Sequence, residues 1–116
     1  MLEQILLPIY ECRTTADKRV SFALAIDHNG YIAVHNRVYL QPQRPGKTAW
    51  NMANCRNKRI FDDRAGIEAA RSTRPYIVQA YKRDMGGGSM AMMREVDAPV
   101  TVARRHWGGV RMACKL

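Results

Sequence analysis

Residues 20–36 read VSFALAIDHNGYIAVHN, in which large and small side chains alternate on both sides of an Asn29-Gly30 pair. This alternation predicts a β-hairpin, because successive side chains of a strand point to opposite faces of a sheet. A two-residue turn would mix large and small residues on each face. A three-residue turn, in which Asp27 pairs with Tyr31 and Gly30 is left-handed, gathers the bulky aliphatic residues on one face. The hydrophobic pattern therefore favours the three-residue turn.

The two predicted faces differ in the size of their side chains. One holds Phe22, Leu24, Ile26, Ile32 and Val34, and the other holds Ala23, Ala25, Asp27, Tyr31, Ala33 and His35. His28 lies in the turn, so a metal pair of His28 with His35 is not expected. His35 projects from the alanine face, which leaves space above it. Either a packed helix fills this space, or it is a ligand pocket with Tyr31, His35 and Asn36 at its rim.

The remaining sequence predicts one helix before this segment and mostly strands after it. We expect helices at residues 2–12 (interrupted by Pro8), in AWNMANCRN with Thr48 as N-cap, and in AGIEAARS after Asp62 or Asp63. We expect strands at 76–84, 90–96, 98–102 and from 106 to the end, with MGGGS as a hairpin loop. The fold class is α+β, with an antiparallel sheet of about five strands. We expect residues 1–19 to be the end of a linker or dimerisation helix with a connection, and residues 20–116 to be the domain.

The last predicted strand can be divided into faces by the same alternation. His106, Val110, Met112 and Cys114 share one face, and Trp107, Arg111 and Lys115 share the other. We expect His106 to point inward, either as a buried, hydrogen-bonded histidine or as a ligand contact. Gly108 and Gly109 indicate a bulge or a close approach by another segment.

The composition is that of a basic domain. Lys and Arg number 19 against 10 Asp and Glu, a net charge of +9, which favours an anionic ligand, an acidic partner or nucleic acid. The basic residues are scattered and no aromatic-rich strand accompanies them, so nucleic-acid binding is not expected. No membrane-length apolar run or signal peptide is present, and no membrane contact is expected. Three cysteines without a CxxC motif are typical of reduced thiols in the cytoplasm.

The sequence contains no motif of known catalytic chemistry. No phosphate loop, dinucleotide fingerprint, zinc motif or nucleophile elbow occurs. Cys55 next to Arg56 could be an activated thiol, but no partner base stands near it in the sequence. We therefore do not expect an enzyme.

Four stretches together resemble one protein family: AIDHNGYIAVHN (25–36), NCRNKRIFDDRAG (54–66), YKRDMGGG (81–88) and VDAPVTVARRHWGGVRMA (96–113). They are similar to the sensory region at the cytoplasmic C-terminal end of some bacterial methyl-accepting chemotaxis proteins. The resemblance runs from about Val20 to Ala113. It implies a Cache/PAS-like domain, with an antiparallel sheet behind a leading helix and short helices enclosing a pocket.

The resemblance also implies a function. The domain would be the ligand-sensing input of a chemoreceptor, relaying pocket occupancy through the N-terminal helix to the rest of the receptor chain, and it would form a homodimer through that helix. Its ligand would be a small anionic molecule or non-covalently bound haem, with His35 or His106 as the axial ligand of the iron. The expected ligand-binding residues are Tyr31, His35, Asn36, Arg56, Tyr81, Arg83 and His106.

One position departs from the family pattern. The turn before His106 reads Arg104-Arg105, where the family has a Gly-Arg pair, and this predicts a different turn geometry. An alternative to ligand sensing is a protein-interaction module with a collapsed pocket, which would bind an acidic partner through its basic face.

Overall fold

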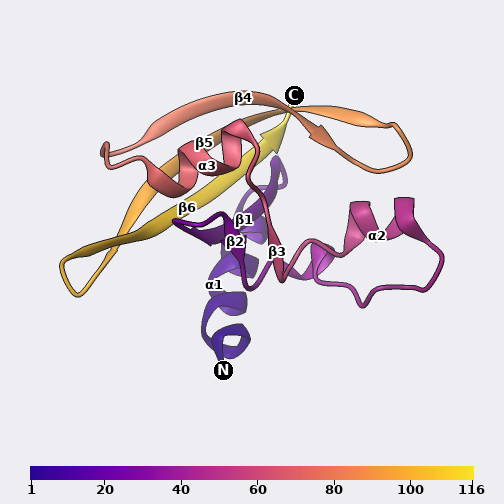
Figure 1. The fold of residues 1–116 in the computed structure, drawn as a ribbon, viewed down its shortest axis with the longest axis horizontal. Coiled ribbons are helices and arrows are strands. Elements are labelled where there is room, and N and C mark those ends of the chain that lie inside the picture. The colour runs from indigo at the N-terminus through magenta and orange to yellow at the C-terminus, as the bar shows by residue number, and fades with distance from the viewer.

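The longest alternating stretches of the sequence form the main sheet of the computed structural model, which describes residues 1–116 (Figure 1). Its strands are β1 (Val20–Asp27), β4 (Ile77–Asp84), β5 (Met90–Val102) and β6 (Arg105–Lys115), and all neighbours are antiparallel in the order β1-β6-β5-β4. Two short strands, β2 (Tyr31–Ile32) and β3 (Arg59–Ile60), form a separate pair. The prediction of an α+β fold with an antiparallel sheet is confirmed, although the main sheet has four strands.

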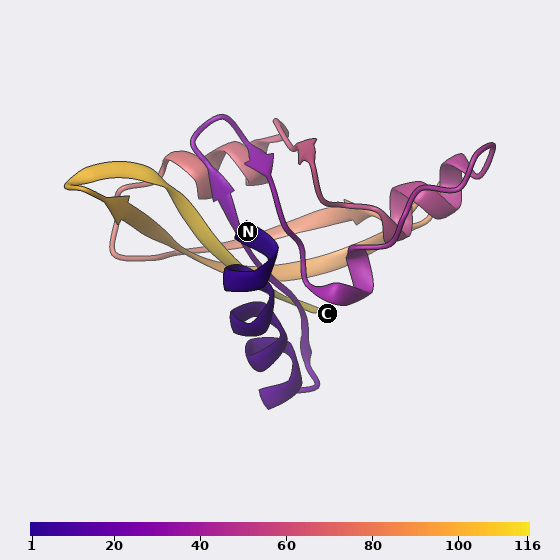
Figure 2. The ribbon, with the colours of Figure 1, turned by 90° about the horizontal axis from the view of Figure 1, so that it is seen from below.

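Helices cover both faces of this sheet. They are α1 (Leu2–Ala16), α2 (Thr48–Asn54), α3 (Arg64–Arg71) and the 3-10 turn η1 (Arg37–Tyr39). Figure 2 shows α3 and the β2–β3 pair on one side of the sheet and α1 on the other. We call the α3 side the inner face and the α1 side the outer face. None of the helices is both long and apolar enough to cross a bilayer.

The predicted hairpin between β1 and β2 is wrong, although its turn is correct. The Gly30 N–H donates to Asp27 O over 2.9 Å, and Gly30 has φ +85, the left-handed conformation that the three-residue turn requires. After the turn the chain leaves the sheet, and Tyr31 pairs with Ile60 of β3 instead of Asp27. Strand β6 takes the place beside β1. A local pattern cannot reveal this pairing, because the paired residues are 81 to 94 positions apart, from Asp27–Gly108 to Val20–Cys114.

A helix, not a pocket with His35 at its rim, lies above the alanine face. Helix α1 packs there: the Tyr10 hydroxyl accepts a hydrogen bond from the Ala25 N–H over 2.9 Å, and Ala23 is 5% exposed. His35 lies on the opposite side, against Phe22. Of the two readings left open by the sequence, the packed helix is correct for the alanines, because methyl-sized side chains allow close approach. An apolar groove of about 420 Å³ remains beside α1; Ala23 lines it and His35 does not.

A β-bulge in β6 changes which side of the sheet its side chains point to. Gly108 pairs with Val100 and His106 with Thr101, so Trp107 is the extra residue. Arg111 and Ala113 are buried on the inner face, whereas Val110 and Met112 are more than 40% exposed on the outer face. The prediction that Val110 and Met112 face inward with His106 is therefore wrong, because the bulge shifts the alternation by one residue.

Smaller boundaries also differ from the prediction. Helix α1 continues through Pro8 to Ala16, and α2 begins at Thr48 with Lys47 at the N-cap position. Residues 90–102 form one strand rather than two. The turn between β5 and β6 keeps left-handed residues at Ala103 (φ 49) and Arg104 (φ 65) although neither is glycine. Two central residues with positive φ are typical of a tight type I′ hairpin.

Candidate functional site: an arginine-lined pocket

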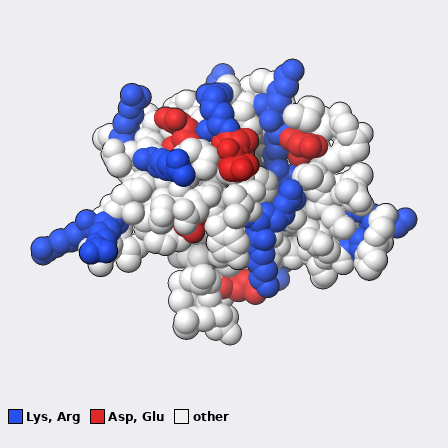
Figure 3. Space-filling view, in the orientation of Figure 1, with Lys and Arg blue, Asp and Glu red and all other residues white.

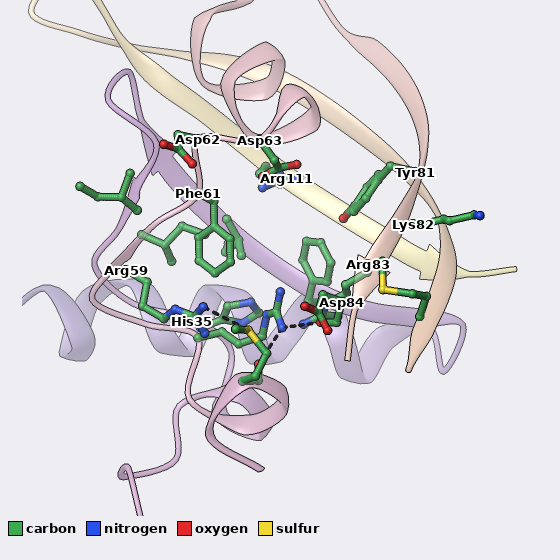
Figure 4. A pocket seen from close by; sticks show the side chains of 17 residues that line it. His35, Arg59, Phe61, Asp62, Asp63, Tyr81, Lys82, Arg83, Asp84 and Arg111 are labelled. Atoms are coloured by element: carbon green, nitrogen blue, oxygen red, sulfur yellow. Dashed lines mark hydrogen bonds between the residues drawn. The ribbon is translucent and has the colours of Figure 1, made fainter. Parts of the chain in front are cut away.

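The inner face of the sheet contains a cavity of about 310 Å³ that opens between the sheet and the segment from α2 to β3 (Figure 4). Strand β1 contributes Phe22 and Leu24 to its wall, and β4 contributes Tyr81 and Arg83. The lining combines aromatic and aliphatic side chains with four arginines: Arg56, Arg59, Arg83 and Arg111. Ligand pockets of proteins commonly have such a volume and such a mixture of apolar walls and a few polar groups.

Arg83 is the least compensated of these arginines. It is 4% exposed, makes no ion pair, and its Nη2 atom has no hydrogen-bond partner. Its guanidinium carbon lies 4.7 Å from the ring centroid of Phe22 and 4.3 Å from that of Tyr39. Aromatic faces partly stabilise a cation, but they do not satisfy its N–H donors. Arg83 therefore brings donors for an anion into the pocket.

Arg56 and Arg59 bond only to neutral protein atoms. Arg56 Nη1 donates to the carbonyls of Met52 and Asp84, at 2.8 and 2.9 Å, and Arg59 Nη1 donates to Cys55 O. Both guanidinium groups lie about the ring of Phe61, at 5.3 and 5.1 Å. Burial, together with the charges of Arg83 and Arg59, lowers the pKa of Arg56 to about 10. The positive charges of Arg56, Arg59 and Arg83 therefore repel one another within the pocket.

Arg111 differs, because Glu95 neutralises it. Its Nε and Nη2 atoms donate to the two carboxylate oxygens of Glu95 at 2.8 and 3.0 Å, and both side chains are buried. The Tyr81 hydroxyl donates to the same carboxylate over 2.8 Å. Burial, and then the neighbouring Glu95 charge, raise the pKa of Tyr81. This network fixes the pocket floor rather than offering free donors.

A second carboxyl group, Asp97, lies beside this network. Gln79 Nε2 donates to Asp97 Oδ2 over 2.9 Å, and Arg111 Nε is 3.8 Å from Asp97 Oδ1. Burial and the nearby Glu95 raise the pKa of Asp97 to about 8. Two buried carboxyl groups facing one guanidinium favour a single negative charge, which favours the protonated form of Asp97.

His35 lines the pocket as a neutral ring. It is 2% exposed, and its ring centroid lies 5.6 Å from that of Phe22 and 5.0 Å from that of Tyr39. Its Nδ1 atom is 2.7 Å from Asn36 Oδ1. Burial, followed by the charge of Arg83, lowers the pKa of His35 well below its usual range.

The structure brings four of the seven sequence-predicted site residues together: His35, Arg56, Tyr81 and Arg83 line the cavity. Asn36 is buried behind His35 and orients it. Tyr31 is 38% exposed on β2 and does not line the cavity. His106 is outside it too, because its Nε2 atom bonds to Ala70 O at the end of α3 over 2.7 Å.

Sequence reasoning did not include several lining residues in the site. Phe22, Leu24 and Ile32 were predicted to share the face of bulky aliphatic residues; they are buried, and they also form the apolar wall. Arg59, Phe61 and Arg111 lie in the stretches that resemble chemoreceptor sensory regions, and the density of arginine there was the available signal.

The structure limits how metals or haem could bind. No three His, Cys, Asp or Glu side chains come close enough to form a metal site. His35 and His106 do not face the same cavity, so a haem in this pocket would have one histidine, His35, as an axial ligand. On the face shown in Figure 3 the basic residues are spread out, with acidic side chains between several of them.

No family model, curated protein or solved structure matches the chain. The resemblance of its motifs to chemoreceptor sensory regions therefore stays a prediction.

Proposed function

We propose that this chain is a ligand-sensing input domain of a bacterial chemoreceptor, of the Cache/PAS-like type and cytoplasmic, and that it binds a small anion in the arginine-lined pocket. The observation that carries the proposal is Arg83, a guanidinium buried to 96% without a carboxylate partner at the wall of a cavity. Removing one partner from a buried ion pair typically costs about 3–5 kcal/mol, so an unpaired buried cation is expected to gain much from an arriving anion.

The surplus of charge supports the same proposal. Arg56, Arg59 and Arg83 are not paired with any carboxylate, whereas Arg111 has Glu95. A carboxylate or a phosphate is the preferred partner of a guanidinium, because it can accept two parallel hydrogen bonds. The acidic residues at the pocket, Asp62, Asp63 and Asp84, are all exposed and make no ion pair with these arginines.

The surroundings of the pocket favour reversible binding over catalysis. Cys55, the candidate nucleophile, does not line the cavity, and its Sγ atom bonds to Pro42 O at 3.4 Å. His35 has no carboxylate partner that would make it a strong base; it bonds to the Asn36 amide. These contacts support a binding protein.

A chain of contacts connects the pocket with α1. Tyr39 of η1 packs on both Arg83 and His35, and the backbone N–H of Arg37, in the same turn, donates to the Glu11 carboxylate of α1. An anion that draws Arg83 away from Tyr39 would thereby change how η1 holds α1. This is the kind of two-state element that sensing requires. A receptor chain joined to α1, and a second copy paired through it, are the partners that this proposal implies.

Ligand-induced stabilisation of the chain tests the proposal. A thermal-shift and calorimetric screen of small carboxylates and phosphates is expected to find a ligand, which at 100 times its Kd adds about 2.7 kcal/mol to the free energy of unfolding. Arg83→Met is expected to lose this stabilisation. Arg94→Met is the matched control, because Arg94 is exposed on the neighbouring strand. Equal binding by both variants would contradict the proposal.

The alternative, an interaction module with a collapsed pocket and an acidic partner, makes a different prediction. Its binding would follow the exposed basic residues, so Arg94→Met and similar surface changes would weaken it while Arg83→Met would not. Haem binding would be visible as a Soret band after reconstitution, lost in His35→Ala.

A further inference from the structure

His35 provides a hydrogen-bond acceptor in a pocket that is also lined by four arginines, which are donors. The side-chain oxygen of Asn36 only accepts hydrogen bonds, so the 2.7 Å contact places the ring proton of His35 on Nδ1. The Nε2 atom of the neutral ring then carries a lone pair. It has no partner within the protein, although the ring is 98% buried and lines the cavity.

The surrounding charges keep the ring in this state. Burial and the charges of Arg83, Arg56 and Arg111 all oppose protonation of His35, and the one side-chain partner that it has is the neutral Asn36. No acidic side chain bonds to it. The lone pair on Nε2 is therefore a fixed feature of the empty pocket.

The acceptor lies beside the unpaired cation. His35 and Arg83 contact the same two rings, Phe22 and Tyr39. Both residues line the cavity and are labelled in Figure 4. A molecule whose anionic group reaches Arg83 is thus next to a group that accepts a hydrogen bond. The apolar lining by Phe22, Leu24 and Ile32 suits a carbon skeleton better than a fully polar ion.

We propose that the pocket is specific for small hydroxycarboxylates, with the carboxylate on Arg83 and the hydroxyl donating to Nε2 of His35. This inference rests on the proposed function. A plain carboxylate that displaces water from the pocket leaves the Nε2 acceptor without a hydrogen-bond donor, which is costly. His35 is then the residue that determines specificity, and Arg83 the residue that determines affinity for the anion.

Calorimetric titration with matched acids tests this assignment. Malate is compared with succinate, and lactate with propionate, because the members of each pair differ only by the hydroxyl. We expect the hydroxy acid of at least one pair to bind about tenfold more tightly, the effect of about one hydrogen bond. In His35→Phe the two members of that pair are expected to bind equally, and in Arg83→Met neither binds.

The outcomes separate the two proposals. Equal affinity within both pairs in the wild-type protein, or a preference for inorganic phosphate over all four acids, overturns the hydroxycarboxylate assignment and leaves anion sensing standing. Binding of none of the four acids and no phosphate overturns both. Because His35→Phe could fold poorly, ¹⁵N spectra of the wild-type histidine ring give an independent readout. They are expected to show a neutral ring with the proton on Nδ1 at pH 7, and a proton on Nε2 would overturn the assignment.

Discussion

The guanidinium carbon of Arg83 lies 4.3 Å from the ring centroid of Tyr39, so one aromatic ring from the turn η1 covers a buried cation of strand β4. The same ring contacts His35 on the edge of the pocket. Arg83 and His35, which determine the chemistry of the pocket, therefore both contact Tyr39, and Tyr39 belongs to the segment that contacts α1.

Replacing Tyr39 by leucine tests this contact. Leucine preserves apolar packing but removes the aromatic face, so we expect the free energy of unfolding to fall by about 1 kcal/mol, the usual size of a partly buried cation–π contact. Urea denaturation measures the change. Tyr76→Leu serves as control, since Tyr76 is 64% exposed, and an equally large loss there would show that the Arg83 contact contributes nothing specific.

The Glu95–Arg111 pair is expected to be essential for stability. In Glu95→Gln the side chain keeps its shape but loses its charge. Arg111 then loses both charge-assisted hydrogen bonds to Glu95 and keeps only Asp97, 3.8 Å away, as a nearby carboxyl group. A loss of about 3 kcal/mol in the free energy of unfolding is expected from breaking a buried pair. Glu68→Gln, a change at an exposed site on α3, should leave denaturation nearly unchanged. A similar loss in both variants would contradict the assigned role of Glu95.

Gly30 fixes the position of Phe61 in the pocket wall. Gly30 has φ +85, and a Cβ atom at this position would lie 2.7 Å from the carbonyl oxygen of Phe61. This distance is a steric clash, so the backbone at Phe61 would have to move. We expect Gly30→Ala to destabilise the domain by about 2–3 kcal/mol, from backbone strain plus displacement of Phe61. Gly88→Ala separates the two causes, because Gly88 has φ +80 but open space around it. Equal losses in the two variants would show that contact with Phe61 is unimportant.

The alternation of the sequence predicted which residues share a face, but not which element covers that face. It placed Phe22, Leu24 and Ile26 together correctly, and all three are buried. It could not show that α1 covers the alanines, or that His35 leaves the strand pattern and turns to the side of Phe22, because both depend on contacts between distant segments. The bulge at Trp107 reversed the predicted facing of Val110 and Met112.

The pocket was only partly predictable for a related reason. Arg56 and Arg83 were predicted from motif resemblance, and both line the cavity. The buried positions of Arg111, Glu95 and Asp97 had no signal in the local pattern, since charged residues in alternating strands are normally read as solvent-facing. Their burial follows from α3 and the β2–β3 segment lying over the inner face (Figure 2).

The stability of the domain should depend on pH through Asp97. Its pKa is about 8 in the folded protein, above the value of about 3.9 for an unperturbed aspartate, so between these values the folded state binds more protons than the unfolded state. The free energy of unfolding is therefore expected to decrease as pH rises from about 4 to about 8, by up to about 1.4 kcal/mol per pH unit from this group.

Asp97→Asn cannot titrate, so the difference between its denaturation curve and that of the wild type, measured at each pH, isolates the contribution of Asp97. Asp62→Asn, at an exposed carboxyl, should keep the wild-type pH profile. A wild-type profile that runs parallel to that of Asp97→Asn from pH 4 to 8 would mean that Asp97 is ionised in the folded protein, and that Glu95 and Asp97 do not compete for Arg111.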